Sequence, residues 1–222
     1  LLIGLVLLLT TVVDGASRAP EADGAAAMEK FLTRPAVARQ YRALRHLEAS
    51  GGGQRGWLDA QTEFSPATGM RYEVMGEGGS GIIRSRVLRP LLEQEQQLIA
   101  TGATGSVAID RANYRFSEDG TDADGRVQVT LQPLRKDRAL IAGTLFLEPH
   151  DGDPVRIEGR LAKNPSFWTR RVDVVRSYTR LNDVIVPRSL ESTAQLRLFG
   201  RSLLRMTYQY SHVVDRPLAD SA

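Results

Sequence analysis

VRIEGRLAKNPSFWTRRVDVVRSYTRLNDVIVPRSLESTAQLRLFGRSLLRMTYQY, residues 155–210, is the stretch of sequence that decides the fold. Apolar and polar residues alternate through four runs, which are separated by proline, asparagine, aspartate and glycine. Alternation with a period of two predicts β-strands with one apolar and one polar face. Because the connections are short, we expect the strands to pair antiparallel, as a meander with one covered face and one solvated face.

The alternation is clearest in the last two runs. In the third run the predicted apolar face holds Val184, Val186, Leu190, Ala194, Leu196 and Leu198, and the predicted polar face holds Ser189, Glu191, Thr193, Gln195 and Arg197. In the fourth run the corresponding sets are Leu204, Met206, Tyr208 and Tyr210 against Arg205, Thr207, Gln209 and Ser211. The two runs therefore predict neighbouring strands that present their apolar sides to the same covering layer.

Residues 1–19 are interpreted as a secretory signal peptide that is truncated at its start. Leu1–Val13 is almost entirely apolar, and small residues follow at Ala16, Ser17 and Ala19. Such a stretch is shorter than the about 20 apolar residues of a membrane span and is typical of a signal-peptide core and cleavage site. An uncleaved anchor or a stray tail is the alternative. We expect an exported, soluble periplasmic protein with no transmembrane segment in its mature chain, which starts with a flexible segment at 20–32.

The composition fits one globular domain, predicted over 33–215 and followed by a tail at 216–222. Of the 222 residues, 42% are hydrophobic and 25% are charged, and there is no cysteine. The absence of cysteine excludes disulfides, thiolate metal sites and a lipid anchor on cysteine. The 29 basic residues are interspersed with 26 acidic ones. Since the sequence shows no basic cluster with interleaved aromatics, no nucleic-acid partner is predicted.

The first half of the domain is predicted to contain two helices and a hairpin. A helix is expected from Thr33 to Leu47, with Val37, Tyr41, Leu44 and Leu47 on one side, Arg39, Arg42 and Arg45 on the other, and a stop at 51–53. The runs 57–64 and 70–75 predict a hairpin. A second helical stripe at 80–99 contains Pro90, which should kink or restart the helix.

Shorter strands are predicted at 112–116, 127–131 and 141–147, with a polar turn at 117–125. The total is two helical elements and eight or nine strands. A sheet of this size with one apolar face must close, pair or be covered. The predicted fold is therefore α+β, a curved antiparallel sheet that forms an unclosed half-barrel with helices as lid or plug.

No motif for a metal or a cofactor is convincing. Gly76–Gly81 matches the G-x-G-x-x-G pattern of dinucleotide loops, but the preceding run alternates as an antiparallel strand does, so a hinge between sheet and helix is favoured. Asp119, Asp122 and Asp124 lack calcium-loop spacing, and a polar turn explains them. His46, His150 and His212 are scattered. We predict no metal, no cofactor and no catalytic residues.

The apolar face and its covering helix predict a hydrophobic cavity. Its expected lining is Trp57, Tyr72, Ile83, Val87, Leu91, Trp168, Val174, Leu196, Met206 and Tyr208. The expected lid hinge is Gly76, Gly78, Gly79 and Gly81. Arg170 and Arg176 share the parity of Val172 and Val174. Either they pair with carboxylates across the sheet, which is the favoured alternative, or they bind an anionic head group at the rim.

The order of these segments resembles a known family. The segments are GEGGSG, RVLRPLLEQE, ANYRF, DGDPVRIEGRLAKNPSFW, YTRLNDVIVPRSLES and FGRSLLRMTYQY, and the resemblance covers residues 41–213. Together they resemble exported bacterial proteins of the outer-membrane lipoprotein-sorting, LolA-like type. The resemblance implies an unclosed antiparallel barrel with helices as lid and plug, in which characterised members carry acyl chains or sense lipoproteins.

The leading hypothesis is a carrier or sensor that shelters acyl chains of lipids or lipoproteins between the sheet and the 80–99 helix. The alternative is an interaction module with a filled core that binds an envelope membrane protein. An enzyme that uses a carboxylate such as Glu158 or Asp173 in the cavity is a third class, and it is not predicted.

Overall fold

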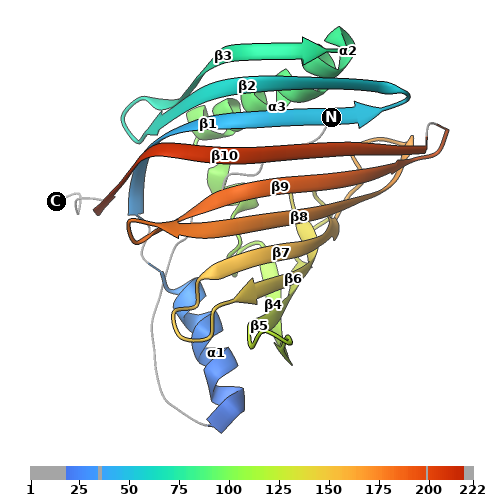
Figure 1. Cartoon of the computed structure of the whole chain (residues 1–222). Helices are drawn as coiled ribbons and strands as arrows, with labels where there is room; N and C mark the ends of the chain where they lie inside the picture. The colour runs from blue at the N-terminus through green and yellow to red at the C-terminus, as the bar shows by residue number, and fades with distance from the viewer. Residues whose placement is uncertain (1–18, 35–36, 199, 218–222) are drawn as a thin grey trace.

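A ten-stranded antiparallel sheet dominates the computed structural model, which describes residues 19–34, 37–198 and 200–217 (Figure 1). The strands are β1 (Val37–Gly51), β2 (Gln54–Ser65), β3 (Gly69–Gly79), β4 (Tyr114–Thr121), β5 (Val127–Pro133), β6 (Ile141–Leu147), β7 (Pro154–Leu161), β8 (Thr169–Leu181), β9 (Val184–Leu196) and β10 (Gly200–Pro217). Their order in the sheet is β3-β2-β1-β10-β9-β8-β7-β6-β5-β4. Every neighbouring pair is antiparallel, and β3 and β4 form the two edges, so the sheet is unclosed.

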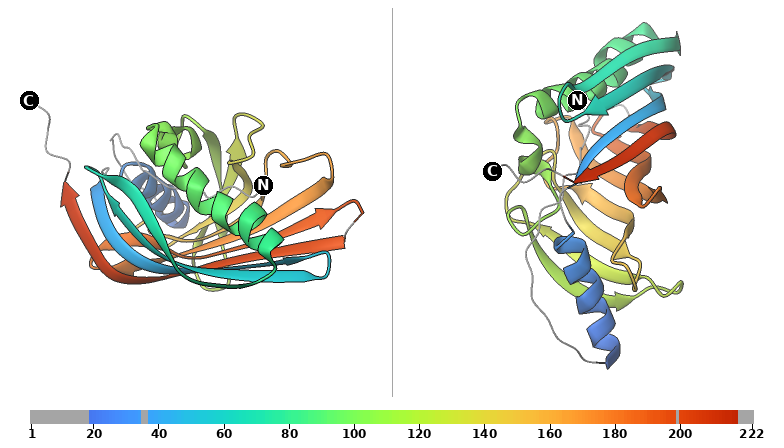
Figure 2. Two further views of the ribbon diagram at one scale, coloured as in Figure 1. Left: turned by 90° about the horizontal axis from the view of Figure 1, so that it is seen from above. Right: turned by 90° about the vertical axis from the view of Figure 1, so that its left-hand side faces the viewer.

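The helical segments lie on the concave side of the curved sheet, as Figure 2 shows. They are α1 (Ala19–Leu32), the continuous cover α2 (Gly81–Ile83), η1 (Arg84–Leu88) and α3 (Arg89–Ala100), and the 3₁₀ segment η2 (Ala103–Val107). The expected helix at 80–99 is therefore confirmed, and so is its interruption: η1 is a π-helical turn, in which the Arg89 N–H donates to the Arg84 carbonyl. Pro90, at the start of α3, has no N–H to donate to the carbonyl four residues earlier, as an α-helix requires. The predicted meander and the 57–75 hairpin are also confirmed.

The expected helix at 33–47 is wrong, because residues 37–51 form strand β1. From Tyr41 to Ala49 the odd-numbered residues of this strand face the concave side, where Ala43, Leu47 and Ala49 are buried. The apolar residues also fit a helical stripe, since Leu44 falls on it, but Leu44 lies on the opposite side of the strand. As a strand, the segment forms backbone hydrogen bonds with β10 on one side and with β2 on the other. A helix would form neither set.

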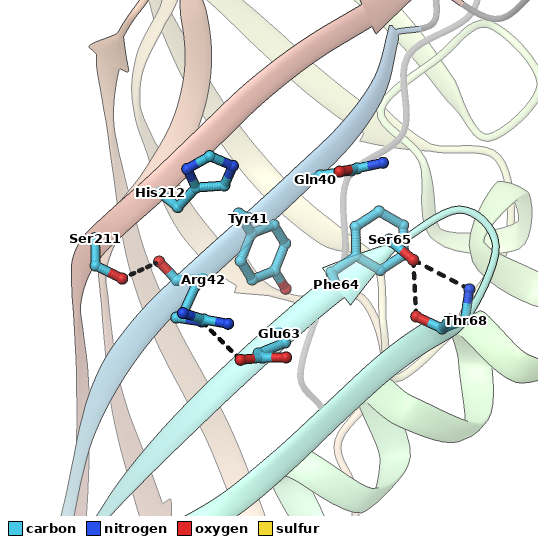
Figure 3. Close-up of a pocket in the computed structure, with 9 residues that line it drawn as sticks. All are labelled: Gln40, Tyr41, Arg42, Glu63, Phe64, Ser65, Thr68, Ser211 and His212. Atoms are coloured by element: carbon cyan, nitrogen blue, oxygen red, sulfur yellow. Dashed lines mark hydrogen bonds and ion pairs between the residues drawn. The ribbon is translucent and has the colours of Figure 1, made fainter.

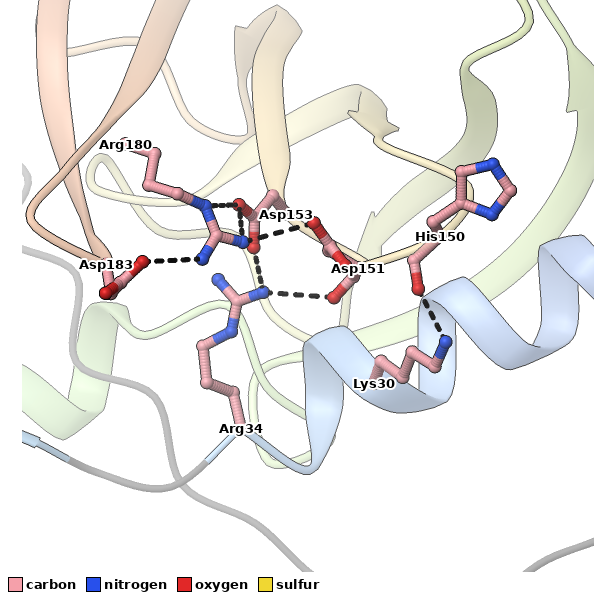
Figure 4. Close-up of polar contacts among 7 residues, drawn as sticks. All are labelled: Lys30, Arg34, His150, Asp151, Asp153, Arg180 and Asp183. Carbon is pink, nitrogen blue, oxygen red and sulfur yellow. Dashed lines mark hydrogen bonds and ion pairs between the residues drawn. The ribbon is translucent and has the colours of Figure 1, made fainter.

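The expected flexible segment at 20–32 is also wrong, because these residues lie in α1. Alanine-rich sequence favours a helix, and Ala27, Phe31 and Leu32 then share a buried stripe. Ion pairs fix the end of the helix to the sheet: Asp153 accepts hydrogen bonds from Arg34 and from Arg180 (Figure 4). Lys30 donates to the His150 carbonyl at 2.5 Å. The segment is therefore an integral layer of the fold.

Three smaller expectations change. The strand count is ten, because β1 is a strand. β4 continues to Thr121, so only the end of the expected 117–125 turn is a turn, with Asp122 Oδ1 accepting from the Asp124 and Arg126 N–H groups. β10 extends to Pro217, two residues into the expected tail. The expected signal peptide at 1–19 lies outside the described residues except for Ala19, and so do residues 218–222 of the tail.

Apolar side chains fill the concave side in two clusters. One lies beneath α1 and is built mainly from β4–β9, with Phe31, Leu145, Leu147 and Ile157 fully buried. The other lies beneath η1 and α3 and is built from β1, β2, β3 and β10, with Leu47, Leu58, Leu88, Leu91 and Leu92 fully buried. A smaller group, where β9 begins and β10 ends, contains Val184, Val186 and Val213. The polar residues described next lie on the same face of the sheet as these clusters.

Candidate functional site

A buried ion pair joins the cover to the floor of the sheet. Arg45 projects from β1 on the concave face, and Glu95 projects from α3 toward it; their exposed fractions are 1% and 7%. The two carboxylate oxygens of Glu95 accept from Arg45 Nη1 at 2.6 Å and Nη2 at 3.0 Å. Arg45 Nη2 also donates to the Tyr41 hydroxyl at 2.8 Å. Burial opposes the charge of Arg45, but the carboxylate of Glu95 holds its pKa well above the ordinary value.

A second buried arginine, Arg176, lies on the same face without a carboxylate partner. It is 4% exposed in β8, and no carboxylate of the described residues lies within ion-pair distance of it. Its Nη1 makes no hydrogen bond in the described part of the chain. Two arginines and one glutamate leave one net positive charge on the apolar concave face of the sheet, which we call the basin. This arrangement is costly, because buried charges are normally paired and hydrogen-bonded.

Tyrosines surround both guanidinium groups. The Arg45 guanidinium lies 4.8 Å from the ring centroid of Tyr208, and the Arg176 guanidinium lies 5.5 Å from that of Tyr178. Tyr208 stacks on Tyr210 with ring centroids 6.0 Å apart, and the Tyr210 hydroxyl donates to the Pro187 carbonyl. We call Arg45, Glu95, Arg176, Tyr41, Tyr178, Tyr208 and Tyr210 the Arg–Tyr cluster.

The tyrosines are expected to ionise late. Burial raises the pKa of Tyr41, Tyr208 and Tyr210, and it raises the pKa of Tyr114 to about 12. The tyrosines of the unfolded chain ionise near pH 10. Raised folded-state values stabilise the fold below about pH 10, and this stabilisation is lost as the pH rises from about 10 toward 12. Absorbance titration of tyrosinate should show one step near pH 10 in denaturant and delayed ionisation without it; superimposable curves would contradict the burial.

An open pocket of about 500 Å³ lies at the end of the sheet where β1 begins and β2 ends (Figure 3). Its lining is Gln40, Tyr41, Arg42, Glu63, Phe64, Ser65, Thr68, Ser211 and His212. Tyr41 stacks on Phe64 here, with ring centroids 5.6 Å apart, and Arg42 donates to Glu63 at 2.6 Å. Tyr41 therefore borders both this pocket and the Arg–Tyr cluster.

Most of the expected cavity residues lie on the concave side. Those in or packed against the two apolar clusters are Tyr72, Ile83, Val87, Leu91, Val174, Leu196, Met206 and Tyr208. They do not line one shared space. Val174 and Leu196 belong to the cluster beneath α1, whereas the others belong to the cluster beneath η1 and α3, which packs directly on the sheet: Ile83 meets the backbone of Gly56, where a Cβ would lie 3.0 Å from it.

Three expected residues lie elsewhere. Trp57 is on the convex face, because its neighbours Gly56 and Leu58 take the concave side, and it stacks on His46. Trp168 is exposed in the connection before β8. Arg170 is exposed because the register shifts between Thr169 and Arg171, which removes Arg170 from the parity of Val172 and Arg176. The expectation that these residues share the covered face is wrong, and the favoured carboxylate pairing of Arg176 is not found among the described residues.

The glycines of the expected hinge have two structural roles. Gly76 and Gly78 lie in β3 opposite Asp59 and Trp57, and a Cβ at Gly78 would lie 2.6 Å from the Trp57 indole nitrogen. Gly79 ends the strand with a φ of 74°, and Gly81 begins α2. The pattern is therefore a strand end followed by a helix start, as the hinge interpretation required, although Gly76 and Gly78 serve to seat a tryptophan.

The carboxylates considered for catalysis lie outside the basin. Glu158 and Asp173 are on the convex face beside buried Ile157 and Val172, and each pairs with an arginine, Arg156 at 2.9 Å and Arg171 at 2.5 Å. Within the described residues, no group of three His, Cys, Asp or Glu side chains could hold a metal ion. His46 Nδ1 lies 2.6 Å from Asp59.

Sequence reasoning missed Arg45, Glu95 and Tyr41. Arg45 was placed on the solvated side of a helix, yet Tyr41, Ala43, Leu47 and Ala49 alternate around it with a period of two. That alternation was the available signal. Glu95 follows Leu88, Leu91 and Leu92 at helical spacing, so its position on the buried stripe of the cover was also readable.

Comparison with known proteins gives one distant similarity in structure. No family model matches the chain, and no curated protein matches it. A solved structure described as a DUF1329 family protein from Desulfovibrio piger aligns with 93% of this chain and 96% of that chain, at 9% identity and a TM-score of 0.43. This similarity assigns neither a family nor a function. Among the described residues, no helix is both long and apolar enough to span a bilayer.

Proposed function

We propose that this chain is a periplasmic lipid-binding protein, a carrier or sensor that holds an acyl chain on the concave face and an anionic head group against Arg176. The observation that carries the proposal is the buried guanidinium of Arg176, which has no carboxylate partner among the described residues. An uncompensated buried charge costs several kcal/mol, and function is a common reason for its retention. A carboxylate or phosphate could accept two parallel charge-assisted hydrogen bonds from the guanidinium. The planar guanidinium suits this bidentate geometry, which a lysine ammonium does not provide.

The apolar surroundings suit the remainder of such a ligand. Leu190 and Met206 follow Arg176 across β9 and β10, and both belong to or pack against the cluster beneath the cover. Each methylene of an acyl chain buried there would contribute roughly 0.8 kcal/mol. In the structure the cover occupies this surface, so binding requires the cover to move away from the sheet.

The cover has the features of a movable segment. Gly79 and Gly102 flank it, and both adopt left-handed φ angles, 74° and 66°. Its π-helical turn interrupts the ladder between α2 and α3, and such turns occur often at functional sites. Polar contacts hold it in place: Glu77 with Arg84 and Arg89, and Glu95 with Arg45. When the cover moves, these ion pairs would break and their charged groups would find other partners. The backbone hydrogen bonds between the strands would remain.

Arg176→Met should abolish selectivity for anionic amphiphiles. We expect at least about tenfold weaker binding of a fluorescent fatty acid, because a charge-assisted pair in a buried site is lost. Unfolding free energy should stay unchanged or rise by about 1 kcal/mol, because the variant removes an unsatisfied buried charge. Arg188→Met, an exposed arginine of the neighbouring strand β9, is the matched control and should bind as the parent chain does.

Native mass spectrometry of the chain purified after export, followed by lipid extraction, identifies the ligand. The proposal fails if no lipid is retained and no anionic amphiphile binds, or if Arg176→Met binds as tightly as Arg188→Met. The tight packing of Leu88, Leu91 and Leu92 against the sheet supports the second candidate, an envelope interaction module with a filled core. That candidate predicts no lipid and a crosslink to an envelope membrane protein.

A further inference from the structure

We infer that one end of the sheet is a docking tip for an anionic lipid surface. The tip consists of two neighbouring turns, 166–169 before β8 and 196–198 at the end of β9, the latter at the right-hand end of the sheet in Figure 1. Its apolar residues are Phe167, Trp168 and Leu198, whose exposed fractions are 75%, 54% and 68%. The pocket of Figure 3 lies at the opposite end, so the tip is a separate surface.

Direct contacts hold the two turns together. The Thr169 N–H donates to the Ser166 carbonyl at 3.1 Å, which places Phe167 and Trp168 at the centre of a tight turn. The Arg197 N–H donates to the Trp168 carbonyl at 2.9 Å. The Arg197 guanidinium lies 4.9 Å from the Phe167 ring centroid, and Phe167 and Trp168 meet edge to face. The tip is therefore an ordered surface that ladder pairing of Thr169 with Leu196 extends into the sheet.

The residue types are unusual for these positions. Glycine, proline, asparagine, aspartate and serine dominate the centres of turns because they suit the backbone and the solvent. Here two large aromatic residues occupy the central positions of one turn, next to an exposed leucine in another. These side chains do not pack into the apolar clusters of the sheet, so burial in the core does not explain them. Grouped exposed apolar side chains mark interaction surfaces.

The charge around the tip selects the partner. Residues 162–171 and 195–203 contain five basic residues and no acidic one: Lys163, Arg170, Arg171, Arg197 and Arg201. Arg171 is held by Asp173, but the other four make no ion pair within the described ranges. The chain as a whole mixes 29 basic with 26 acidic residues, so this end is a local concentration of positive charge.

Exposed aromatic side chains with basic residues close by fit the boundary between lipid tails and anionic head groups. Tryptophan and phenylalanine insert at that boundary, and arginine and lysine near an anionic leaflet are attracted by its negative surface potential. A nucleic acid would also meet basic and aromatic groups, but Leu198 and, on the adjoining convex face, Leu203 offer nothing that stacks on a base. The tip would bring the basin to a bilayer, yet it can bind lipid surfaces whether or not the basin holds a ligand.

The chain offers a built-in reporter for the test, because it contains two tryptophans. Trp57→Phe leaves Trp168 as the sole source of indole fluorescence. The full chain with this substitution is titrated with phosphatidylcholine vesicles, with vesicles that also contain phosphatidylglycerol, and with brominated lipids. We expect a blue shift and quenching of Trp168 with the anionic vesicles, weaker with neutral vesicles and reduced by salt.

Phe167→Ser with Trp168→Ser should lower partitioning into anionic vesicles at least about tenfold in a flotation assay. The matched control, Met75→Ser with Leu134→Ser, removes exposed apolar surface away from the tip and should leave partitioning unchanged. Arg197→Gln with Arg201→Gln should remove the preference for anionic vesicles, and circular dichroism checks that each variant folds. The inference is overturned if Trp168 emission does not respond to vesicles, if the control loses as much binding, or if an oligonucleotide but not a vesicle shifts the emission.

Discussion

Glu95→Gln is expected to destabilise the fold by about 3–5 kcal/mol, because it leaves Arg45 charged and buried without a counter-charge. Arg45 is fully enclosed by the sheet and the cover, and Glu95 accepts two of its hydrogen bonds. The amide keeps the size of the side chain and one acceptor oxygen, so the loss measures the missing negative charge. Denaturant unfolding followed by circular dichroism gives the change in free energy.

Two further variants make this result specific. Glu93→Gln, on the exposed side of the same helix, should change stability by less than about 0.5 kcal/mol. Arg45→Met combined with Glu95→Leu should recover most of the stability, because an apolar pair of similar volume replaces the ion pair. If Glu95→Gln unfolds at the same denaturant concentration as the Glu93→Gln control, the cover is not held through this pair.

Phe31→Ala is the second large effect, with an expected loss of about 3–5 kcal/mol. Phe31 is 0% exposed, and it lies in the α1 cluster beside the strands of the second half of the sheet. Removing the ring leaves a cavity that α1 cannot fill, since the ion pairs at Asp153 fix the end of the helix. The measurement is again equilibrium unfolding in denaturant.

Lys30→Ala is the control for this helix. Lys30 is exposed and makes one hydrogen bond to a backbone carbonyl, so its loss should cost less than about 1 kcal/mol. The comparison decides between the sequence-based expectation and the structure. A flexible segment at 20–32 would make both substitutions neutral, whereas an integral α1 makes only Phe31→Ala severe.

The strands of the second half could be predicted because each shows a single unambiguous period. Leu204, Met206 and Tyr208 alternate with polar residues, so only a strand places them on one face. β1 could not be assigned in the same way, because Tyr41, Leu44 and Leu47 satisfy a helical period while Arg45 interrupts the period of two. Tertiary pairing with β10 and β2 decided the outcome, and local sequence does not encode it.

The candidate site was predictable only in part, for a similar reason. Parity along β8 places Arg176 on the concave face, as expected, but the register shift at its start moves Arg170 out of that row. Parity within one strand cannot reveal such a shift. Nor can it reveal that Glu95, from a helix fifty residues along the chain, takes Arg45 as its partner and leaves Arg176 without one.

The pairing of β1 with β10 joins, in the middle of the sheet, the first and the tenth of the described strands in chain order. His46 aligns with Thr207 and Leu47 with Met206, so this ladder can form only after the chain has been synthesised as far as β10. Until then β1 pairs with β2 on one side only and β9 pairs with β8 on one side only, so each exposes an unpaired edge to other chains. Contacts so distant in sequence slow folding and lengthen the exposure of unpaired edges. The pairing of β10 therefore decides when the edges of β1 and β9 are protected from association with other chains.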